Sequence, residues 1–300
     1  MVRLGIVDFD SSHAVAFTRI LNQVHPSKEQ WVVGARIVAG CPLPSAVQSE
    51  EKVKEYAQQC AAAGVEMVDS PEELLGRVDG VMIESDDGRT HLERARPFLE
   101  AGLPVWIDKP LAFSLAEARE ILDLAASHKA PVFSASSLRY AAEVVDVKQQ
   151  SQTYGEVLGA MTFSPSKDQG SNPGLIYYGI HAIEMLYALM GPGCRWVSGA
   201  ESPEGIVVTA QWDDGRICSL RGTRAGSHAF GFTAWCEKTV VQRVVNTGFI
   251  YRELMKQVVV FFQTGISPVP LEETFETIAF GQAALTSLKR QGERVPVERY

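Results

Sequence analysis

Residues 78–112, VDGVMIESDDGRTHLERARPFLEAGLPVWIDKPLA, contain one complete strand–helix–strand repeat. The apolar run GVMIES (80–85) predicts a buried strand, HLERARPFLEAG (91–102) predicts a helix, and PVWIDKP (104–110) predicts the next strand. Strands that alternate with helices in this order are typical of parallel sheets, because each helix carries the chain back to the start of the next strand. This stretch therefore predicts one repeat of an α/β fold.

The same alternation extends through residues 1–136. Further strands are predicted at 3–9, 32–40, 65–70 and 130–136. Helices are predicted at 11–24, 49–64 and 114–127, and a capping box at Ser70–Glu73 predicts the start of another. We therefore predict that residues 1–136 form a doubly wound parallel sheet with crossover helices.

The pattern changes after residue 136. Strand-like segments now follow one another at 156–164, 205–212, 216–223, 230–236 and 239–246. Helices are predicted near the start and the end of this region, at about 174–190 and 271–290. Residues 137–300 are therefore predicted to form a second, α+β domain with an open, mainly antiparallel sheet.

The composition excludes several classes of protein. A formal net charge of −8, without a cluster of Lys and Arg, argues against a nucleic-acid partner. The N-terminus lacks a targeting pattern, and no apolar run approaches the ~20 residues of a membrane span; the longest, around 258–262, is predicted to be core. Five cysteines without a Cys-x-x-Cys pair indicate a cytoplasmic protein with reduced thiols rather than a disulfide framework or a zinc site.

Three segments together resemble the Gfo/Idh/MocA family of NAD(P)-dependent oxidoreductases. Residues 78–112 end in Asp108-Lys109-Pro110 at the family's Glu-Lys-Pro position. PGLIYYGIHAIEMLYALMG (173–191) is similar to the family's stretch ending in Asp-x-Gly-x-His-x-x-Asp, and 261–297 resembles its last helix and strand. The resemblance implies a Rossmann-type domain at 1–136 and a domain for substrate binding and oligomerisation at 137–300. It further implies hydride transfer on a sugar, polyol or related hydroxy compound in a homodimer or homotetramer that assembles through the second-domain sheet.

The resemblance assigns catalysis to Lys109 and His181. Lys109 follows a strand of an open α/β sheet, where ligands bind, and its neighbours Trp106 and Pro110 would limit its solvation. An imidazole titrates near neutral pH, which suits His181 to the deprotonation of a substrate hydroxyl. A surface lysine and a core histidine remain the structural alternatives.

Three further residues are assigned to the substrate. Glu184, three residues after the histidine, matches the family's final acid and is expected to orient the imidazole ring. Tyr177 replaces the family's aspartate, and a phenol with a pKa near ~10 is no carboxylate base at neutral pH. Arg139 matches an arginine that follows the sixth strand and faces the substrate, with a structural salt bridge as the alternative.

The first strand–helix connection departs from the family. GIVDFDSSHAVAF (5–17) has Asp8, Asp10 and His13 where Gly-x-Gly-x-x-Gly lets backbone amides approach a diphosphate. Two carboxylates there would repel the diphosphate unless they are neutralised. Asp10 can also be explained as the N-cap of the first helix, which leaves Asp8 without an explanation.

The predicted cofactor is NAD or NADP, with NAD preferred. Its diphosphate would lie near Ser11 and Ser12 and the backbone amides of the helix N-terminus. The second strand ends without an acid for the adenosine ribose and without an arginine for a 2′-phosphate. The complete set predicted to contact the cofactor is Asp8, Asp10, Ser11, Ser12, His13, Ser85, His91, Asp108 and Lys109, although His91 is equally consistent with a structural role at a helix N-terminus.

Two alternatives remain open. A relative that has lost nucleotide binding would be a non-redox sugar-binding or regulatory protein, and the missing glycines favour it. A divalent cation held by Asp8, Asp10 and His13, with Asp86 or Asp87, is the other alternative. The Asp-x-Asp pattern is too short to be specific, so no metal is predicted.

Overall fold

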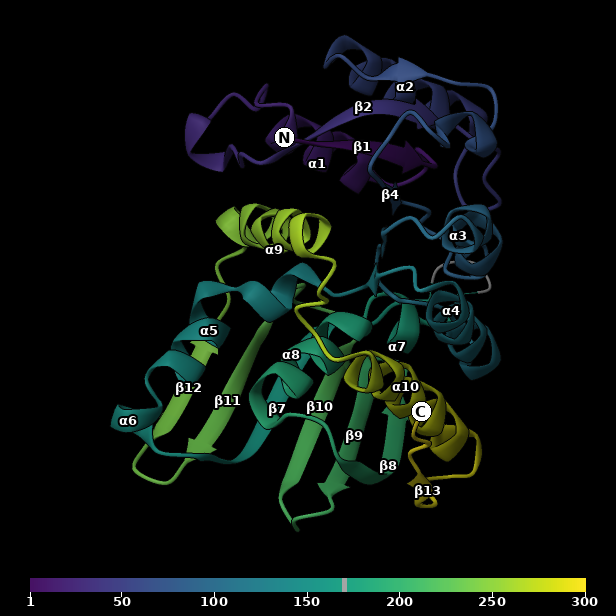
Figure 1. Ribbon diagram of the computed structural model, residues 1–300. Helices are drawn as coiled ribbons and strands as arrows, with labels where there is room; N and C mark the ends of the chain where they lie inside the picture. Colours follow the sequence, from purple (N-terminus) through teal and green to yellow (C-terminus); the bar gives the residue numbers. More distant parts are fainter. Residues whose placement is uncertain (169–171) are drawn as a thin grey trace. The chain divides into compact units, whose positions relative to one another are not determined.

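A computed structural model describes residues 1–168 and 172–300 of the chain (Figure 1). The chain divides into two compact units. The first unit consists of Met1–Ala112, Ala116–Ala135 and Tyr251–Leu271, and the second of Phe113–Leu115, Ser136–Ile250 and Glu272–Tyr300. Compared with the predicted division at residue 136, the first unit therefore gains a segment from late in the chain.

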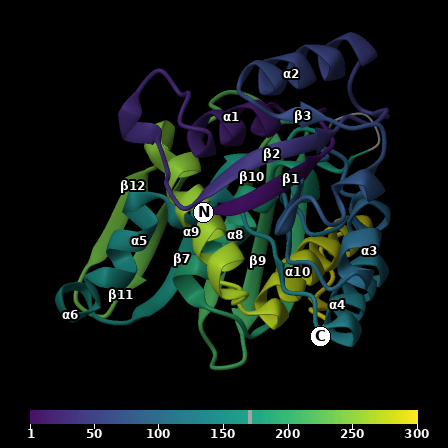
Figure 2. The ribbon, with the colours of Figure 1, turned by 45° about the horizontal axis from the view of Figure 1, so that its top comes forward.

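A six-stranded parallel sheet forms the centre of the first unit (Figures 1 and 2). Its strands lie in the order β3-β2-β1-β4-β5-β6, the order of dinucleotide-binding sheets of the Rossmann type. The predicted doubly wound fold is confirmed, with strands β1 (Val2–Val7), β2 (Ala35–Cys41), β3 (Glu66–Met67), β4 (Gly80–Ile83), β5 (Val105–Ile107) and β6 (Val132–Phe133).

Helices connect these strands as the sequence predicts. The Ser70–Glu73 capping box forms, but it starts only a 3₁₀ turn, Pro71–Leu74. Gly76 follows two residues later with a φ of +76°, and the chain does not continue as a helix. The α-helices of this region are α1 (Ser12–Leu21), α2 (Glu50–Ala62), α3 (His91–Glu100) and α4 (Leu115–His128).

The late segment of the first unit contains α9 (Ile250–Thr264), which includes the apolar block at 258–262. Phe261 of this helix is fully buried, and its ring lies 5.6 Å from that of Phe133 in β6. Gly80 in β4 leaves room for the helix, because a Cβ at this position would lie 2.5 Å from the Phe262 ring. The core of the first unit is thus completed by residues that come after most of the second unit in sequence.

The second unit is built on a seven-stranded sheet, β12-β11-β7-β10-β9-β8-β13. All of its pairs are antiparallel except β7 with β10, which agrees with the predicted open, mainly antiparallel sheet. The strands are β7 (Val157–Pro165), β8 (Cys194–Ser202), β9 (Gly205–Trp212), β10 (Ile217–Thr223), β11 (Gly231–Cys236), β12 (Val240–Val244) and β13 (Val295–Pro296).

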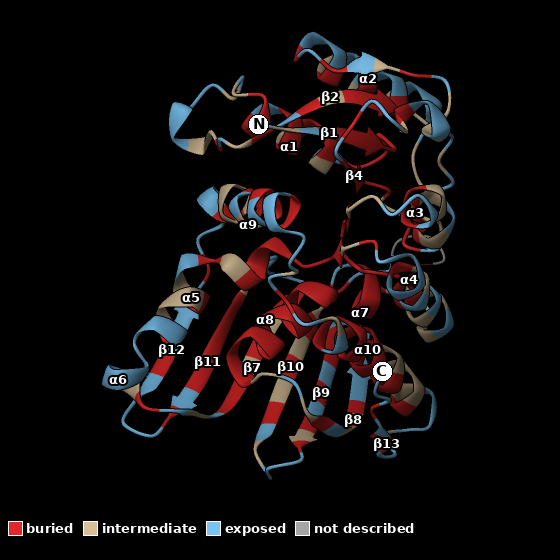
Figure 3. Cartoon of the chain, viewed as in Figure 1, coloured by how far each residue is buried: buried red, intermediate tan, exposed pale blue. Residues whose placement is uncertain are grey.

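Helices α8 and α10 cover one face of this sheet (Figures 1 and 2). Every residue of α8 is buried (Figure 3). The helix predicted at 174–190 is divided at Gly179, where a Cβ would lie 2.6 Å from the carbonyl oxygen of Leu175. The α-helices of the second unit are α5 (Ala142–Gln149), α6 (Ser151–Tyr154), α7 (Gly174–Tyr177), α8 (Ile180–Met190) and α10 (Leu271–Lys289).

Among the helices of residues 1–168 and 172–300, none combines the length and the apolar character that crossing a membrane requires.

Candidate functional site

The carboxyl ends of β1, β4 and β5 lie side by side in the first unit. Asp8, Glu84 and Asp108 each follow directly after one of these strands. The chain order reverses between β1 and β4, and in open α/β sheets such a reversal is where ligands bind. The strand order therefore brings together acidic residues that are far apart in sequence.

Asp8 takes the backbone conformation of the glycine that it replaces. Its φ is +70°, in the left-handed region that glycine occupies without strain. The carboxylate is buried and accepts a hydrogen bond from Nε of Arg94 in α3, at 3.2 Å. Burial raises the pKa of Asp8 to about 7, although the Arg94 charge lowers it. At neutral pH its negative charge is therefore partly removed by protonation and partly balanced by Arg94.

Asp10 links two loops and does not cap the first helix. Its Oδ2 accepts a hydrogen bond from the Ser45 hydroxyl at 2.7 Å, and its Oδ1 accepts one from the backbone N–H of Asp86 at 2.8 Å. The N-cap of α1 is Ser11, whose hydroxyl accepts a hydrogen bond from the backbone N–H of His13. Burial raises the pKa of Asp10 above its ordinary value despite these two donors. The alternative explanation of Asp10 as the N-cap is thus wrong, because the helix begins one residue later.

His13 lies between Asp108 and a tyrosine of α9. Its Nδ1 is 2.6 Å from Oδ2 of Asp108, and its Nε2 is 3.0 Å from the Tyr251 hydroxyl. The imidazole also packs against the Phe17 ring, with 5.0 Å between the ring centroids. These contacts fix the ring at the edge of the sheet, in the position of the family's third glycine.

Lys109 and Glu84 are buried beside Asp108. The backbone N–H of Lys109 donates a hydrogen bond to Oδ1 of Asp108, and the Lys109–Pro110 peptide bond is cis. Burial alone would raise the pKa of Asp108, but the charges of His13 and Lys109 hold it below its ordinary value. Glu84 is fully buried, and neither of its carboxylate oxygens has a hydrogen-bond partner within the part of the chain that the structure describes. Burial and the Asp108 charge raise the pKa of Glu84 well above its ordinary value.

The other residues predicted to contact the cofactor take structural or exposed positions. His91 is fully buried, with Nε2 at 2.9 Å from the carbonyl oxygen of Ser85 and Nδ1 at 3.2 Å from that of Leu111. The Ser85 hydroxyl accepts a hydrogen bond from Thr90. Ser12 is exposed in the first turn of α1, beside the N-cap. His91 therefore ties the loop after β4 to the segment after β5.

His181 is held at the start of α8 in the second unit. The Ser136 hydroxyl lies 2.7 Å from its Nδ1, and Ser136 also caps the following 3₁₀ turn by accepting the N–H of Leu138. The imidazole packs edge-on against Tyr178 and Phe230, with centroid distances of 5.1 and 5.6 Å. Its Nδ1 is thus bonded to a serine that the sequence reasoning did not identify.

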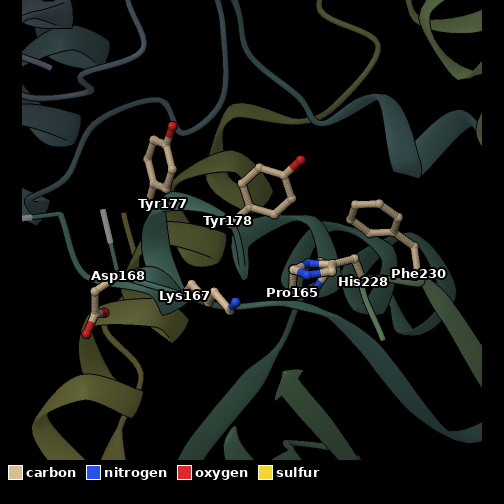
Figure 4. A pocket seen from close by; sticks show the side chains of 7 residues that line it. All are labelled: Pro165, Lys167, Asp168, Tyr177, Tyr178, His228 and Phe230. Atoms are coloured by element: carbon tan, nitrogen blue, oxygen red, sulfur yellow. The ribbon is translucent and has the colours of Figure 1, made fainter. Parts of the chain in front are cut away.

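Tyr178 and Phe230 also line a cavity of about 450 Å³ in the second unit. Figure 4 shows Tyr177 and Tyr178 with both hydroxyl groups pointing away from the segment that carries Lys167 and Asp168. The remaining lining residues are Pro165 and His228. The cavity therefore combines aromatic walls with charged and hydroxyl groups.

Arg139 and Glu184 form part of a buried ion-pair cluster. Nε of Arg139 donates to Glu184 at 2.6 Å, and its Nη1 donates to Glu273 of α10 at 2.5 Å. Burial would lower the pKa of Arg139, but the two carboxylates outweigh it and hold the pKa above its ordinary value. Burial raises the pKa of Glu184 despite the arginine. The structural salt bridge that the sequence left open for Arg139 is thus present, and it includes Glu184.

The residues of the first unit fit a dinucleotide with one difference from the family. The strand order, the positive φ of Asp8 and the start of α1 at Ser12 retain the strand–turn–helix geometry of a phosphate loop. Arg94 balances the charge of Asp8, and a hydroxyl and an amide solvate Asp10. The repulsion expected from these carboxylates is therefore reduced, whereas β2 ends at Cys41 without an acid for the ribose.

Part of the first unit matches a known protein family. Residues 45–136 match the model of the Gfo/Idh/MocA family, described as an oxidoreductase family with an NAD-binding Rossmann fold. This match confirms the predicted resemblance for residues 45–136, which include the Asp108-Lys109-Pro110 motif. No curated protein matches the chain at a significant level.

Three solved structures, two of them of inositol dehydrogenases, share the fold over 99% of this chain. A myo-inositol dehydrogenase from Corynebacterium glutamicum has a TM-score of 0.80 at 15% identity, covering 99% of both chains. A scyllo-inositol dehydrogenase from Lactobacillus casei, solved with NAD(H) and scyllo-inositol, has a TM-score of 0.79 at 15% identity and covers 99% of both chains. GenD2 from gentamicin A biosynthesis, solved with NAD, has a TM-score of 0.79 at 15% identity and covers 99% of this chain and 96% of its own.

Sequence reasoning missed three residues of these sites, Glu84, Ser136 and Tyr251. Glu84 had a signal, because an acid directly after the apolar run GVMI falls where a parallel strand delivers side chains to a ligand. Ser136 and Tyr251 had none, because the chain segments that bring them to the two histidines are paired only by tertiary packing.

Proposed function

We propose that the protein is an NAD(P)-dependent dehydrogenase that oxidises a hydroxyl group of a sugar, polyol or related compound. The observation that carries the proposal is the setting of His181, which is fixed by Ser136 and packs against two aromatic walls of a cavity. The family match of residues 45–136 supports the oxidoreductase chemistry. NAD is preferred over NADP, because β2 is not followed by an arginine for a 2′-phosphate.

Lys109 and His181 are proposed as the residues that orient the substrate hydroxyl and accept its proton. The nicotinamide, when bound, supplies the hydride acceptor. Ser11, Ser12 and the N-terminal turn of α1 would hold its diphosphate. Lys109 is buried directly after β5, where the low dielectric strengthens its electrostatic interaction with a polar group.

A polyhydroxylated ring suits the cavity of the second unit. Its volume of about 450 Å³ is in the range of small-molecule sites. Aromatic rings such as Tyr178 and Phe230 pack against the apolar faces of a ring, while Tyr177, Lys167 and Asp168 offer polar groups to its hydroxyls. The inositol bound to the Lactobacillus casei relative belongs to the same chemical class.

We further propose that the protein forms a homodimer or homotetramer through the second sheet. The face opposite α8 exposes Val207, Ile217 and Trp235, and Met161 and Phe163 are half-buried beside them. Ile217 and Trp235 both pair with Gly159 in register, so two large apolar side chains flank a position without one. Apolar patches of this kind are typical of protein interfaces. Trp235→Glu is expected to lower the mass measured by light scattering to that of a monomer.

The proposed location is the cytoplasm. Its support is the state of the five cysteines, all of which are free thiols and buried. Proteins of oxidising compartments more often pair their cysteines.

A sugar-binding or regulatory protein without redox activity is the second candidate. The observation that favours it is Asp10, which is buried where the family has a glycine and already accepts the N–H of Asp86. This amide is therefore not available to a diphosphate.

The test is a titration of the purified protein with NADH and NADPH, followed by energy transfer from tryptophan. Binding is expected, and turnover is then measured with myo-inositol, scyllo-inositol and a panel of sugars. Lys109→Ala and His181→Ala are each expected to lower kcat by about 10²–10⁴-fold with little change in affinity for the cofactor. The exposed residues Lys54 and His128 provide matched controls, because their replacement by alanine leaves both sites unchanged. Absence of binding at about millimolar cofactor, the upper end of ordinary KM values, would favour the second candidate.

A further inference from the structure

Three potential metal ligands converge at the edge of the first sheet. They are His13 at the start of α1, Glu84 directly after β4 and Asp108 directly after β5. One ligand atom from each of the three lies within 4.8 Å of the other two. One comes from the helix that follows β1 and two come from the ends of the neighbouring strands β4 and β5, so the fold of the first unit brings them together.

Among these three residues, Glu84 provides the strongest evidence for a bound ligand. Its side chain is fully buried, and within residues 1–168 and 172–300 neither carboxylate oxygen has a hydrogen-bond partner. Burying a carboxylate ion without a partner lowers the free energy of unfolding by several kcal/mol. Burying the neutral carboxyl group unpaired still lowers it by about 1–3 kcal/mol. No feature of the proposed dehydrogenase chemistry uses this side chain.

The charges around Glu84 are also unbalanced. Asp108 and Asp10 both act on it as like charges, and Lys109 is the cation that acts in the opposite sense. A protonated His13 pairs with Asp108 and reduces the excess to one negative charge. With His13 neutral, as a metal ligand must be, three ionised carboxylates against one lysine leave an excess of two negative charges. A divalent cation would balance this excess.

We propose that His13, Glu84 and Asp108 bind one first-row divalent cation of the Mn²⁺ or Zn²⁺ type. One imidazole and two carboxylates suit these ions better than Ca²⁺, which takes oxygen ligands only. This site differs from the predicted alternative, because Asp8 is paired with Arg94, Asp10 with Ser45 and the amide of Asp86. Binding does not depend on the proposed dehydrogenase function and can be tested apart from it.

Tyr251 serves as the partner that orients the histidine. Its hydroxyl is 3.0 Å from Nε2, on the side of the imidazole away from Asp108. Metal-binding histidines use one ring nitrogen for the ion and donate from the other to a second group. With the ion bound, Nε2–H donates to the Tyr251 oxygen and the Nδ1 lone pair faces the ion, in place of the 2.6 Å contact to Asp108.

The test is a titration of the EDTA-treated full-length protein with Mn²⁺, followed by the electron paramagnetic resonance signal of the free ion. Mn²⁺ is the main probe because the free ion gives a strong paramagnetic resonance signal that is lost on binding. One ion per chain is expected. Glu84→Gln should weaken binding by at least about 10-fold, and Tyr251→Phe, which keeps all three ligands, by about 10-fold.

Glu100→Gln, an exposed glutamate at the end of α3, is the matched control and should bind like the unmodified protein. Calorimetric titrations with Zn²⁺ and Ca²⁺ complete the series, and Ca²⁺ should bind more weakly than Mn²⁺. Circular dichroism verifies that each variant is folded. Two results would overturn the proposal. One is the absence of saturable binding up to about millimolar Mn²⁺, a concentration far above the dissociation constants of sites of this kind. The other is equal binding by Glu84→Gln and the unmodified protein.

Discussion

The guanidinium of Arg94 lies against the carboxylate of Asp8, with 3.2 Å between Nε and Oδ2. The two residues are 86 positions apart, and their contact joins α3 to the turn after β1. Asp8 thereby keeps the left-handed backbone of a glycine while its side chain fills the space that glycine leaves empty. The acidic first turn of this protein is therefore a folded unit with its own counter-charge.

Asp8→Asn is expected to stabilise the protein at pH 8. Burial raises the folded-state pKa of Asp8 to about 7 from an ordinary value of 3.8, so the folded state binds more protons than the unfolded state between these values. Stability from Asp8 is therefore present at low pH and lost as the pH rises from about 4 to 7. Asparagine tolerates the positive φ and avoids this loss, which predicts a gain of about 1–3 kcal/mol at pH 8.

Urea denaturation of both proteins at pH 4.5 and pH 8 measures this difference. The stability gain should be small at the lower pH, where Asp8 is protonated. A gain of equal size at both values would show that the charge of Asp8 is not its cause.

Ser136→Ala is expected to disturb His181 without unfolding the protein. The Ser136 hydroxyl oxygen accepts the N–H of Leu138, and its second lone pair can accept Nδ1–H of His181, which directs the Nε2 lone pair to the proton-accepting role proposed for this residue. Nitrogen-15 spectra of the imidazole should therefore show the Nδ1–H tautomer in the unmodified protein and a mixture in the variant. Where turnover is measurable, kcat should fall by about 10-fold with a smaller change in KM. A single unchanged tautomer in the variant would remove Ser136 from this role.

Arg139→Met is expected to destabilise the protein by about 3–5 kcal/mol. The change leaves Glu184 and Glu273 buried without their shared cation. Adding Glu184→Gln and Glu273→Gln to the same chain removes both charges and should recover most of the loss. Guanidinium denaturation of the single and triple variants measures both effects, and a triple variant as unstable as the single one would contradict the electrostatic cause.

Phe261→Ala is expected to destabilise the first unit by about 3–5 kcal/mol. Phe261 is fully buried in α9 and contacts Phe133 of β6, although about 130 residues separate them in sequence. Thermal unfolding followed by circular dichroism measures the loss. Val260, exposed on the same helix, provides the control, and its replacement by alanine should change stability by less than about 0.5 kcal/mol. Similar effects of the two substitutions would show that α9 does not complete this core.

The local pattern of the sequence was sufficient for most of the fold. Apolar runs that alternate with amphipathic segments predicted the parallel strands, and the change to successive alternating segments predicted the second sheet. The prediction was less complete at residues 174–190. Their pattern predicts one helix, whereas the structure has two, α7 and α8, separated by Tyr178 and Gly179.

The candidate sites were predicted less completely than the fold. Lys109 and His181 were identified from motifs, and their roles remain predictions. Glu84 lies near Lys109, and Ser136 contacts His181. Both come from other segments of the chain, and no sequence spacing predicts that they lie near these two residues. The salt bridge considered for Arg139 could be suggested from its type, but its second acid, Glu273, comes from the last long helix.

The sequence by itself determined which residues follow each strand, because hydrophobic periodicity fixes where a strand ends. It predicted strands at 3–9, 80–85 and 104–110, whose last residues include Asp8, Glu84 and Asp108; in the structure each strand ends one residue before the acid. Only the tertiary structure decided that these three strands are neighbours, and that α9 returns to bring Tyr251 against His13. The physical reason is that strand order and helix return depend on which apolar surfaces pack together, a property of the whole chain that no local pattern contains.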